Sequence, residues 1–160
     1  MILHFLRTTL IAVSICLSLG LTSHGQDKNP AAAKATAHEK IAMEYMDVLE
    51  EMNNTILTAT NLKSSKKAAE SIIKLQAKVD SIAERLKTME PPSNEKKKGI
   101  EAKMKAHPGT VDNAMAQKLQ KTMLNLSDNS QRIISNAMST FYENLDKHDR
   151  IFNKHFKPAN

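Results

Sequence analysis

The sequence has little glycine and almost no cysteine, and each shortage excludes kinds of chemistry. Of four glycines in 160 residues, only Gly99 and Gly109 lie beyond residue 25, and tryptophan does not occur. The chain therefore has no glycine-rich loop to hold phosphate groups. It also lacks the strand-turn-helix that exposes a catalytic serine. Cys16 is the only cysteine.

The first 25 residues have the three-part pattern of a secretory signal peptide. Arg7 gives a basic start, and residues 9–21 form a short apolar run. Residues 23–25, Ser-His-Gly, have the small-x-small spacing that signal peptidase recognises. A membrane-spanning helix needs about 20 apolar residues, more than this run provides. We therefore expect cleavage after residue 25, a periplasmic or secreted protein, and no transmembrane segment after processing.

Removal of the signal peptide would change the cofactor chemistry and the net charge of the chain. Cys16 is expected to leave with the signal peptide unlipidated, because Ile15 stands where a small residue should precede it. Covalent haem attachment and thiolate metal sites are then excluded. Loss of Arg7 reduces 23 basic residues to 22 against 17 acidic residues, a net charge of +5. The mature chain must be held together by a hydrophobic core, and its length suffices for one domain.

Positive charge is densest around Lys96-Lys97-Lys98, with Lys103 and Lys105 close behind. Such a cluster favours an acidic protein or an anionic envelope component as partner, although a solvated helix face has the same pattern. Nucleic acid is not expected, because no aromatic residue alternates with these lysines to stack on bases.

Helical periodicity begins after a polar, alanine-rich stretch, residues 26–36, that we interpret as a flexible tether. Thr36 is predicted to cap the first helix, with Glu39 completing a capping box. Two seams follow with apolar residues three and four apart. The first contains Ile41, Tyr45, Val48, Met52, Ile56 and Ala59, and the second contains Ile72, Leu75, Val79, Ile82, Leu86 and Met89. Pro91 and Pro92 then end the second helix.

The remaining sequence predicts two more helical elements. A third helix is kinked or split near Pro108, and a turn is expected within residues 126–132. The last seam contains Ile134, Met138, Phe141, Leu145, His148, Phe152 and His155. The fold class is therefore all-α, with residues 37–157 forming an antiparallel up-down four-helix bundle.

Four-helix bundles include the di-iron carboxylate proteins, and the sequence excludes their metal site. The di-iron carboxylate proteins need a glutamate three residues before a histidine. For His38, His107, His148 and His155 the residues at that position are Ala35, Met104, Leu145 and Phe152.

Three methionines occur within residues 43–52. At 100° per residue from Ile41, Met52 falls in the apolar arc, Met46 on its edge at about 140° and Met43 just inside the polar face at about 200°. Met43 and Met46 are therefore expected to form a partly exposed margin used for packing or partner contact. Copper(I) favours thioethers, and Met43, Met46 and His38 are a second alternative set of ligands. His38, at about 60°, does not share a face with Met43.

His148 and His155 occupy seam positions where leucine is usual. In an up-down bundle the start of the first helix lies beside the end of the last, which brings Met46 or Met43 to the depth of His148. The helix count, the Pro-Pro after the second helix and this methionine-histidine placement resemble the small exported b-type cytochromes. The resemblance implies non-covalent haem b with Met46 and His148 as axial ligands and His155 in reserve. The C-terminal "RIFNKHFK" lacks that family's Tyr-His pair.

The leading interpretation is an exported, non-catalytic helical-bundle protein that binds a protein or an envelope partner. A small periplasmic helical chaperone has a similar composition, but the Leu-Thr-x-x-Gln repeats of that family are absent. Haem b remains the first alternative, and copper(I) the second.

Overall fold

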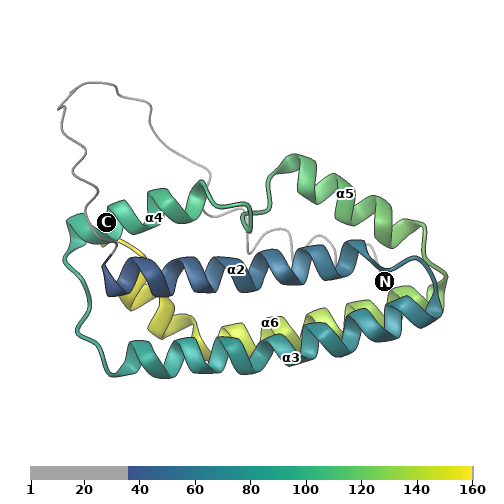
Figure 1. Ribbon diagram of the computed structural model, residues 1–160, viewed down its shortest axis with the longest axis horizontal. Helices are drawn as coiled ribbons and strands as arrows, with labels where there is room; N and C mark the ends of the chain where they lie inside the picture. Colours follow the sequence, from purple (N-terminus) through teal and green to yellow (C-terminus); the bar gives the residue numbers. More distant parts are fainter. Residues whose placement is uncertain (1–35, 160) are drawn as a thin grey trace. The chain divides into compact units, whose positions relative to one another are not determined.

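The computed structural model describes residues 36–159. This part of the chain contains helices and no strand, which confirms the all-α class (Figure 1). The helices are α2 (Ala37–Leu57), α3 (Leu62–Lys87), α4 (Asn94–Lys105), α5 (Asn113–Leu124) and α6 (Asp128–Phe156). Among them, none combines the length and the apolar content of a membrane span. The predicted signal peptide and residues 26–35 of the predicted tether lie outside the described residues.

The start of α2 confirms the predicted capping box. The Glu39 N–H donates to Thr36 Oγ1 at 3.2 Å, and the Thr36 N–H donates to the Glu39 carboxylate at 2.7 Å. These two bonds satisfy backbone donors that the first turn of a helix leaves free. Six side chains on the inner side of α2 are buried apolar groups: Ile41, Ala42, Met46, Val48, Met52 and Ile56.

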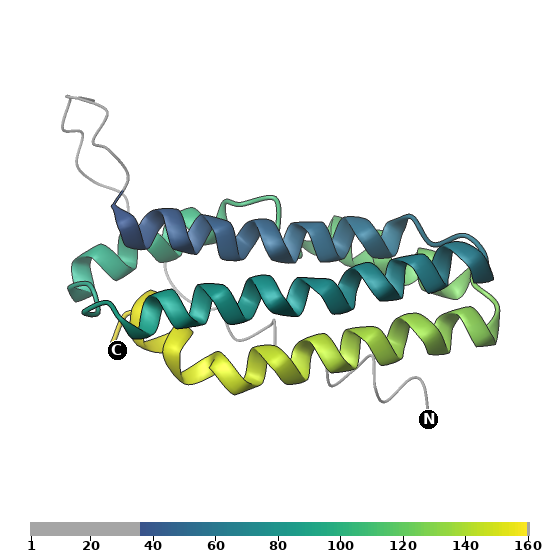
Figure 2. The same ribbon diagram turned by 60° about the horizontal axis from the view of Figure 1, so that its bottom comes forward.

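α3 has the most regular apolar seam, and the structure buries it as predicted. The buried members are Ile72, Leu75, Val79, Ile82 and Leu86, whereas Met89 at the end is partly buried. α3 packs most extensively against α6 and next against α2 (Figure 2). The core of the described residues therefore lies mainly along α3, between these two helices.

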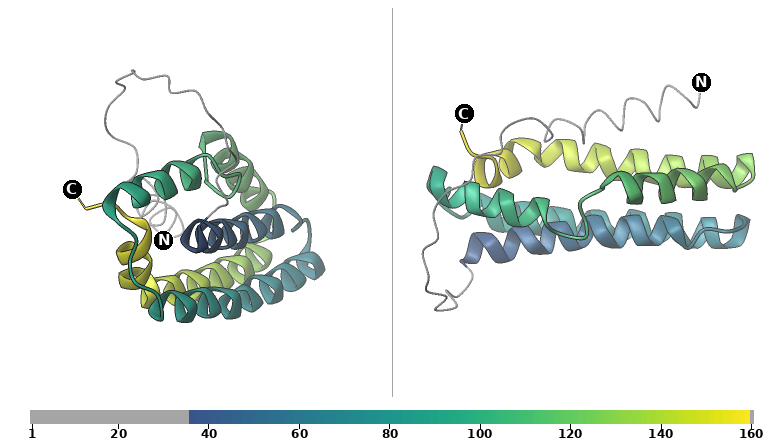
Figure 3. Two further views of the ribbon diagram at one scale, coloured as in Figure 1. Left: turned by 60° about the vertical axis from the view of Figure 1, so that its left-hand side comes forward. Right: turned by 90° about the horizontal axis from the view of Figure 1, so that it is seen from above.

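The region predicted as a third helix contains two helices, α4 and α5, separated by residues 106–112. Both contact α2, and they follow one another along it (Figure 3). Only Ile100 of α4 is fully buried, and α5 has no fully buried residue. α5 is therefore attached to the core only through partly buried side chains such as Leu119 and Met123.

The end of α6 lies beside the start of α2, as predicted for an up-down arrangement. Aromatic rings join the two helices: Tyr45 is 4.8 Å from Phe152 and 6.1 Å from Phe156, measured between ring centroids. The last turns of α6 also contact α4. Asn94, the first residue of α4, donates from its side chain to the Ala159 carbonyl at 3.3 Å and accepts the Ala159 N–H at 2.7 Å. The ends of α2, α4 and α6 therefore meet.

Candidate functional site

The four histidines within residues 36–159 fall into two kinds of environment. His107 and His148 each face an aspartate. His38 and His155 instead stack on each other. Because imidazole is the most versatile acid, base and metal ligand in proteins, these positions are the candidates for chemistry.

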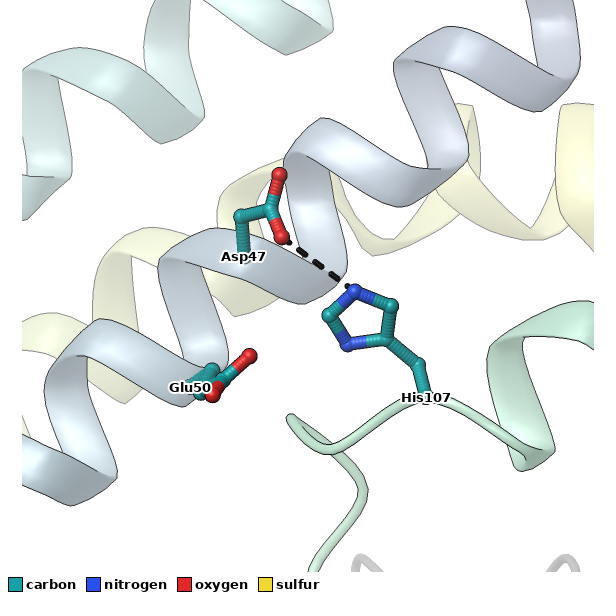
Figure 4. A group of neighbouring side chains, drawn as sticks. All are labelled: Asp47, Glu50 and His107. Carbon is teal, nitrogen blue, oxygen red and sulfur yellow. Dashed lines mark ion pairs between the residues drawn. The ribbon is translucent and has the colours of Figure 1, made fainter.

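His107 lies in the connection between α4 and α5 and points toward the polar side of α2 (Figure 4). Its Nε2 is 3.2 Å from Asp47 Oδ1, and Glu50 lies one turn along α2. Ligand atoms of these three residues lie within 4.8 Å of one another. A histidine with two carboxylates is a donor set that a divalent cation can use.

The hydrogen bonds of His107 do not fit a metal ligand. The Gly109 N–H donates to His107 Nδ1 at 3.0 Å, so Nδ1 carries a lone pair and the proton of the neutral ring is on Nε2. That N–H faces the Asp47 carboxylate. A metal on Nε2 would require the proton to be on Nδ1, opposite another donor, whereas metal-bound histidines donate from their second nitrogen. The arrangement is that of a histidine-aspartate hydrogen bond.

Glycine at position 109 allows the same connection to rest on the backbone of α2. A Cβ atom there would come within 2.2 Å of the Met46 carbonyl oxygen. The buried Asn53 side chain donates to the Gly109 carbonyl at 3.5 Å, and the Thr110 hydroxyl donates to the Met104 carbonyl at 2.6 Å. His107 and Gly109 therefore fasten residues 106–112 onto α2.

His148 holds α6 against α3 through Asp80. Asp80 Oδ1 is 2.7 Å from His148 Nε2 and accepts the Asn144 side-chain N–H at 2.9 Å. These two bonds, first that of Asn144 and then that of His148, lower the pKa of the Asp80 carboxyl. A histidine-carboxylate pair activates a nucleophile in hydrolases. Among the described residues, neither His107 nor His148 is hydrogen-bonded to a hydroxyl.

The predicted haem ligands have separate neighbours. Met46 is 4 % exposed, so its predicted place in a partly exposed margin is wrong, whereas Met43 is only partly buried. Residues 106–112 lie against the backbone of α2 at this residue, on a side that a single buried face would leave open. His148 Nε2 is bonded to Asp80 Oδ1 at 2.7 Å. Haem binding by this pair, and copper(I) binding by Met43, Met46 and His38, stay predictions.

His155, the reserve haem ligand, is 1 % exposed and stacks on His38. The ring centroids are 5.4 Å apart and the ring planes differ by 18°. His38 Nε2 and His155 Nδ1 are buried and have no hydrogen-bond partner. Burial lowers the pKa of both imidazoles, because removal from water disfavours their charged form. The pair thus joins the start of α2 to the end of α6 as two neutral rings.

Lysines surround this junction. Lys96, Lys97 and Lys98 lie in the first half of α4, and Lys154 and Lys157 lie at the end of α6. We call these five residues the basic end. Within residues 36–159, none of the five forms an ion pair with a carboxylate, whereas Lys103 pairs with Glu39 at 2.8 Å. Glu90 and Glu95 lie in the same region and offset part of the charge.

A polar hollow lies between the second half of α2 and the start of α3. It is lined by Asp47, Glu50, Glu51, Asn54, Thr55, Thr58, Ser64, Lys67, Ala68 and Ser71. Several of these groups already serve the helix ends: the Thr58 hydroxyl donates to the Thr55 carbonyl, and Ser64 belongs to the capping box of α3. Two of its acids are engaged as well, Asp47 by His107 and Glu51 by Lys78.

The sequence predicted the lysine cluster and the seam positions of His148 and His155, but not the partners of the histidines. Comparison of the chain with protein-family models, with curated proteins and with solved structures finds no match in any of the three.

Proposed function

We propose that this chain is an exported, non-catalytic helical-bundle protein that binds an anionic envelope component, and that contact is made by the basic end. One observation carries the proposal: three consecutive lysines at the start of α4 have no acidic partner among the described residues. The start of a helix is the positive end of its dipole, where lysine is unfavourable. These lysines therefore do not stabilise α4.

Charge at this place suits an anionic surface. Lys154 and Lys157 extend the cluster from a second helix, and the paired bonds between Asn94 and Ala159 keep the two groups together. Each lysine near an anionic surface adds about 1 kcal/mol of attraction, and the attraction is screened by salt. Five such residues supply useful binding energy without a deep pocket.

The architecture supports a binding role more than catalysis. We propose that α4 and α5 together occupy the third position of an antiparallel up-down bundle, an arrangement supported by their succession along α2 (Figure 3). His107 and His148 are engaged by aspartates that hold elements together. This use of the two histidines favours a structural role for both.

Vesicle binding tests the proposal. Mature protein should co-sediment with phosphatidylcholine vesicles that contain phosphatidylglycerol and not with phosphatidylcholine alone, and rising salt should release it. Replacement of Lys96, Lys97 and Lys98 by glutamine should remove most of this binding.

A matched control is available at the start of α3. Lys63, Lys66 and Lys67 are exposed lysines in the first turns of a helix, at the opposite end of α3 from α4, and α3 is about 39 Å long. Their replacement by glutamine removes the same charge and should leave most of the binding. Equal losses in both triple variants would show a dependence on net charge alone and refute the basic end, and absence of binding by the parent protein would refute the anionic surface.

Export rests on the predicted cleavage site and has its own measurement. The intact mass of protein purified from the cell envelope should correspond to a chain that begins at Gln26 and carries no lipid. A mass that includes residues 1–25, or a lipid on Cys16, would contradict this part of the proposal.

A further inference from the structure

The histidine pair beneath the basic end differs chemically from the other two histidines. His107 and His148 each have a carboxylate oxygen within 3.2 Å of Nε2. Within residues 36–159, neither His38 nor His155 is paired with a carboxylate, and the two rings stack on each other. A proton on one of these two rings would lie beside a second imidazole and no acid.

Most of the charged groups around the pair add to this cost. The charged groups that act on the rings are Lys96, which faces His38, and Lys97 and Lys154, which face His155. Glu39, next to His38 in the chain, is engaged by Lys103 and by the Thr36 N–H. The one contact that favours a charged ring is the Glu90 backbone carbonyl, which is hydrogen-bonded to His38. Three lysines therefore oppose protonation, and one backbone oxygen favours it.

The pair lies at the ends of two helices. His155 precedes the last helical residue of α6, and His38 lies in the first turn of α2. Opening there breaks the end of one helix and the contacts of Phe152 and Phe156 with Tyr45, whereas the middle of α6 can stay packed on α3. Local opening at a helix end requires much less free energy than global unfolding. A buried positive charge without a partner is relieved by such an opening, which returns the ring to water.

We propose that the stacked rings of His38 and His155 are an acid-sensitive fastening, which holds the last turns of α6 on α2 and α4 when both rings are neutral and releases them when a ring takes up a proton. This proposal involves no binding partner and does not depend on the proposed function. Release separates Lys154 and Lys157 from the lysines of α4; the effect of this separation on binding does rest on the proposed function.

The direction of the effect follows from proton linkage. Both rings have a pKa below the ordinary histidine value of 6.5 in the closed end. The closed end is therefore most stable above pH 6.5. As the pH falls below that value, the open end binds protons that the closed end does not, and opening becomes more favourable.

Hydrogen exchange measured by mass spectrometry on the mature protein tests the fastening. Protection factors, which correct for the intrinsic pH dependence of exchange, are compared at about pH 7.5 and about pH 5. Protection of residues 150–157 should fall several-fold at the lower pH, whereas that of residues 134–145 in the middle of α6 should change little. Equal protection of the last turns at both pH values would overturn the proposal.

Substitutions assign the effect to the pair. The double variant His38→Phe/His155→Phe keeps two stacked rings and removes both titrating groups, so its last turns should stay protected at the lower pH. His148→Gln is the matched control on the same helix, and it should still lose protection in acid. A double variant that opened in acid like the parent protein would overturn the proposal.

A second measurement decides the matter if the double variant does not fold. Ring signals of His38 and His155 in NMR spectra of the parent protein should titrate over the same pH range as the loss of protection. Rings that became protonated while residues 150–157 stayed protected would show that the end tolerates the charge, and would overturn the fastening.

Discussion

Asp80 on α3 and His148 on α6 are joined across 68 positions of sequence by a 2.7 Å contact between Oδ1 and Nε2. The same oxygen accepts the side-chain N–H of the buried Asn144. Asp80 is thus the one residue through which two polar side chains of α6 are held to α3, across the most extensive helix interface of the described residues.

The first prediction concerns removal of this carboxylate. Asp80→Ala should lower the free energy of unfolding by about 1–2 kcal/mol at neutral pH, because it leaves the Asn144 N–H buried without an acceptor. Asp146→Ala, at an exposed position of α6, should change it by less than about 0.5 kcal/mol. Urea denaturation measures both values.

The same contact predicts a pH dependence. The pKa of Asp80 is lowered in the folded protein, so its contribution is fully present above the ordinary value of 3.8 and is lost as the pH falls through the lower folded value. The difference between Asp80→Ala and the parent protein should therefore persist from neutral pH to about pH 4 and shrink in stronger acid. A difference that already disappeared at pH 6 would contradict this assignment.

Replacement of Gly109 and of Gly99 by alanine should change the stability of the protein in opposite directions. Gly109→Ala places a Cβ 2.2 Å from the Met46 carbonyl oxygen and should destabilise the protein by about 1–3 kcal/mol, or lift residues 106–112 off α2. Gly99 lies inside α4 with nothing within 4 Å of the added carbon. Gly99→Ala should stabilise the helix by about 0.5–1 kcal/mol. Chemical denaturation of the two variants provides the comparison, and equal effects would refute the close contact.

Replacement by alanine of two methionines three residues apart on α2 should lower stability by different amounts. Met46→Ala removes a side chain that is 4 % exposed and should cost about 2–5 kcal/mol. Met43→Ala, at a partly buried position, should cost about 1 kcal/mol or less. Leu75→Ala on α3 provides a reference for a fully buried seam position, also at about 2–5 kcal/mol. If Met43→Ala were the most destabilising of the three, the orientation of α2 would be wrong.

Visible absorption spectroscopy tests the haem alternative. Protein purified from a haem-replete host should be colourless, because His148 Nε2 is engaged by Asp80 and the Met46 side chain is buried. A methionine-histidine haem would show the sharp reduced bands of low-spin, six-coordinate iron. Such bands, if lost in His148→Ala, would establish haem with the predicted ligand, and loss in His155→Ala alone would move the ligand to the reserve position.

The regular parts of the fold were predictable because they depend on neighbours in sequence. The seam from Ile72 to Leu86 repeats at helical spacing, and such a repeat is buried wherever another helix lies against it. The Thr36–Glu39 capping box depends on two residues three positions apart. Met46 was misplaced because a helical wheel assumes one buried face, whereas α2 is contacted by α3, α4 and α5.

The polar pairs could not be predicted for a different reason. Asp47 and His107 are 60 positions apart, and Asp80 and His148 are 68 positions apart. Nothing in helical periodicity specifies which exposed aspartate meets which histidine, because this depends on the rotation and height of two packed helices. The position of His155 in a seam did indicate burial, but its stacking on His38 depends on the meeting of the two helix ends.

Because the α3–α6 interface is the most extensive one among the described residues, the chain should tolerate a break between these two helices. Residues 88–127, which include α4 and α5, connect α3 to α6 but are not part of the interface between these two helices. Closing this long connection has an entropic cost that grows only slowly with its length. A cut in the turn between α5 and α6 would therefore leave the best-packed helix pair complete on two separate polypeptides. We expect a synthetic peptide that covers α6 to reassemble with a chain truncated after α5, so that the last helix can be supplied in trans.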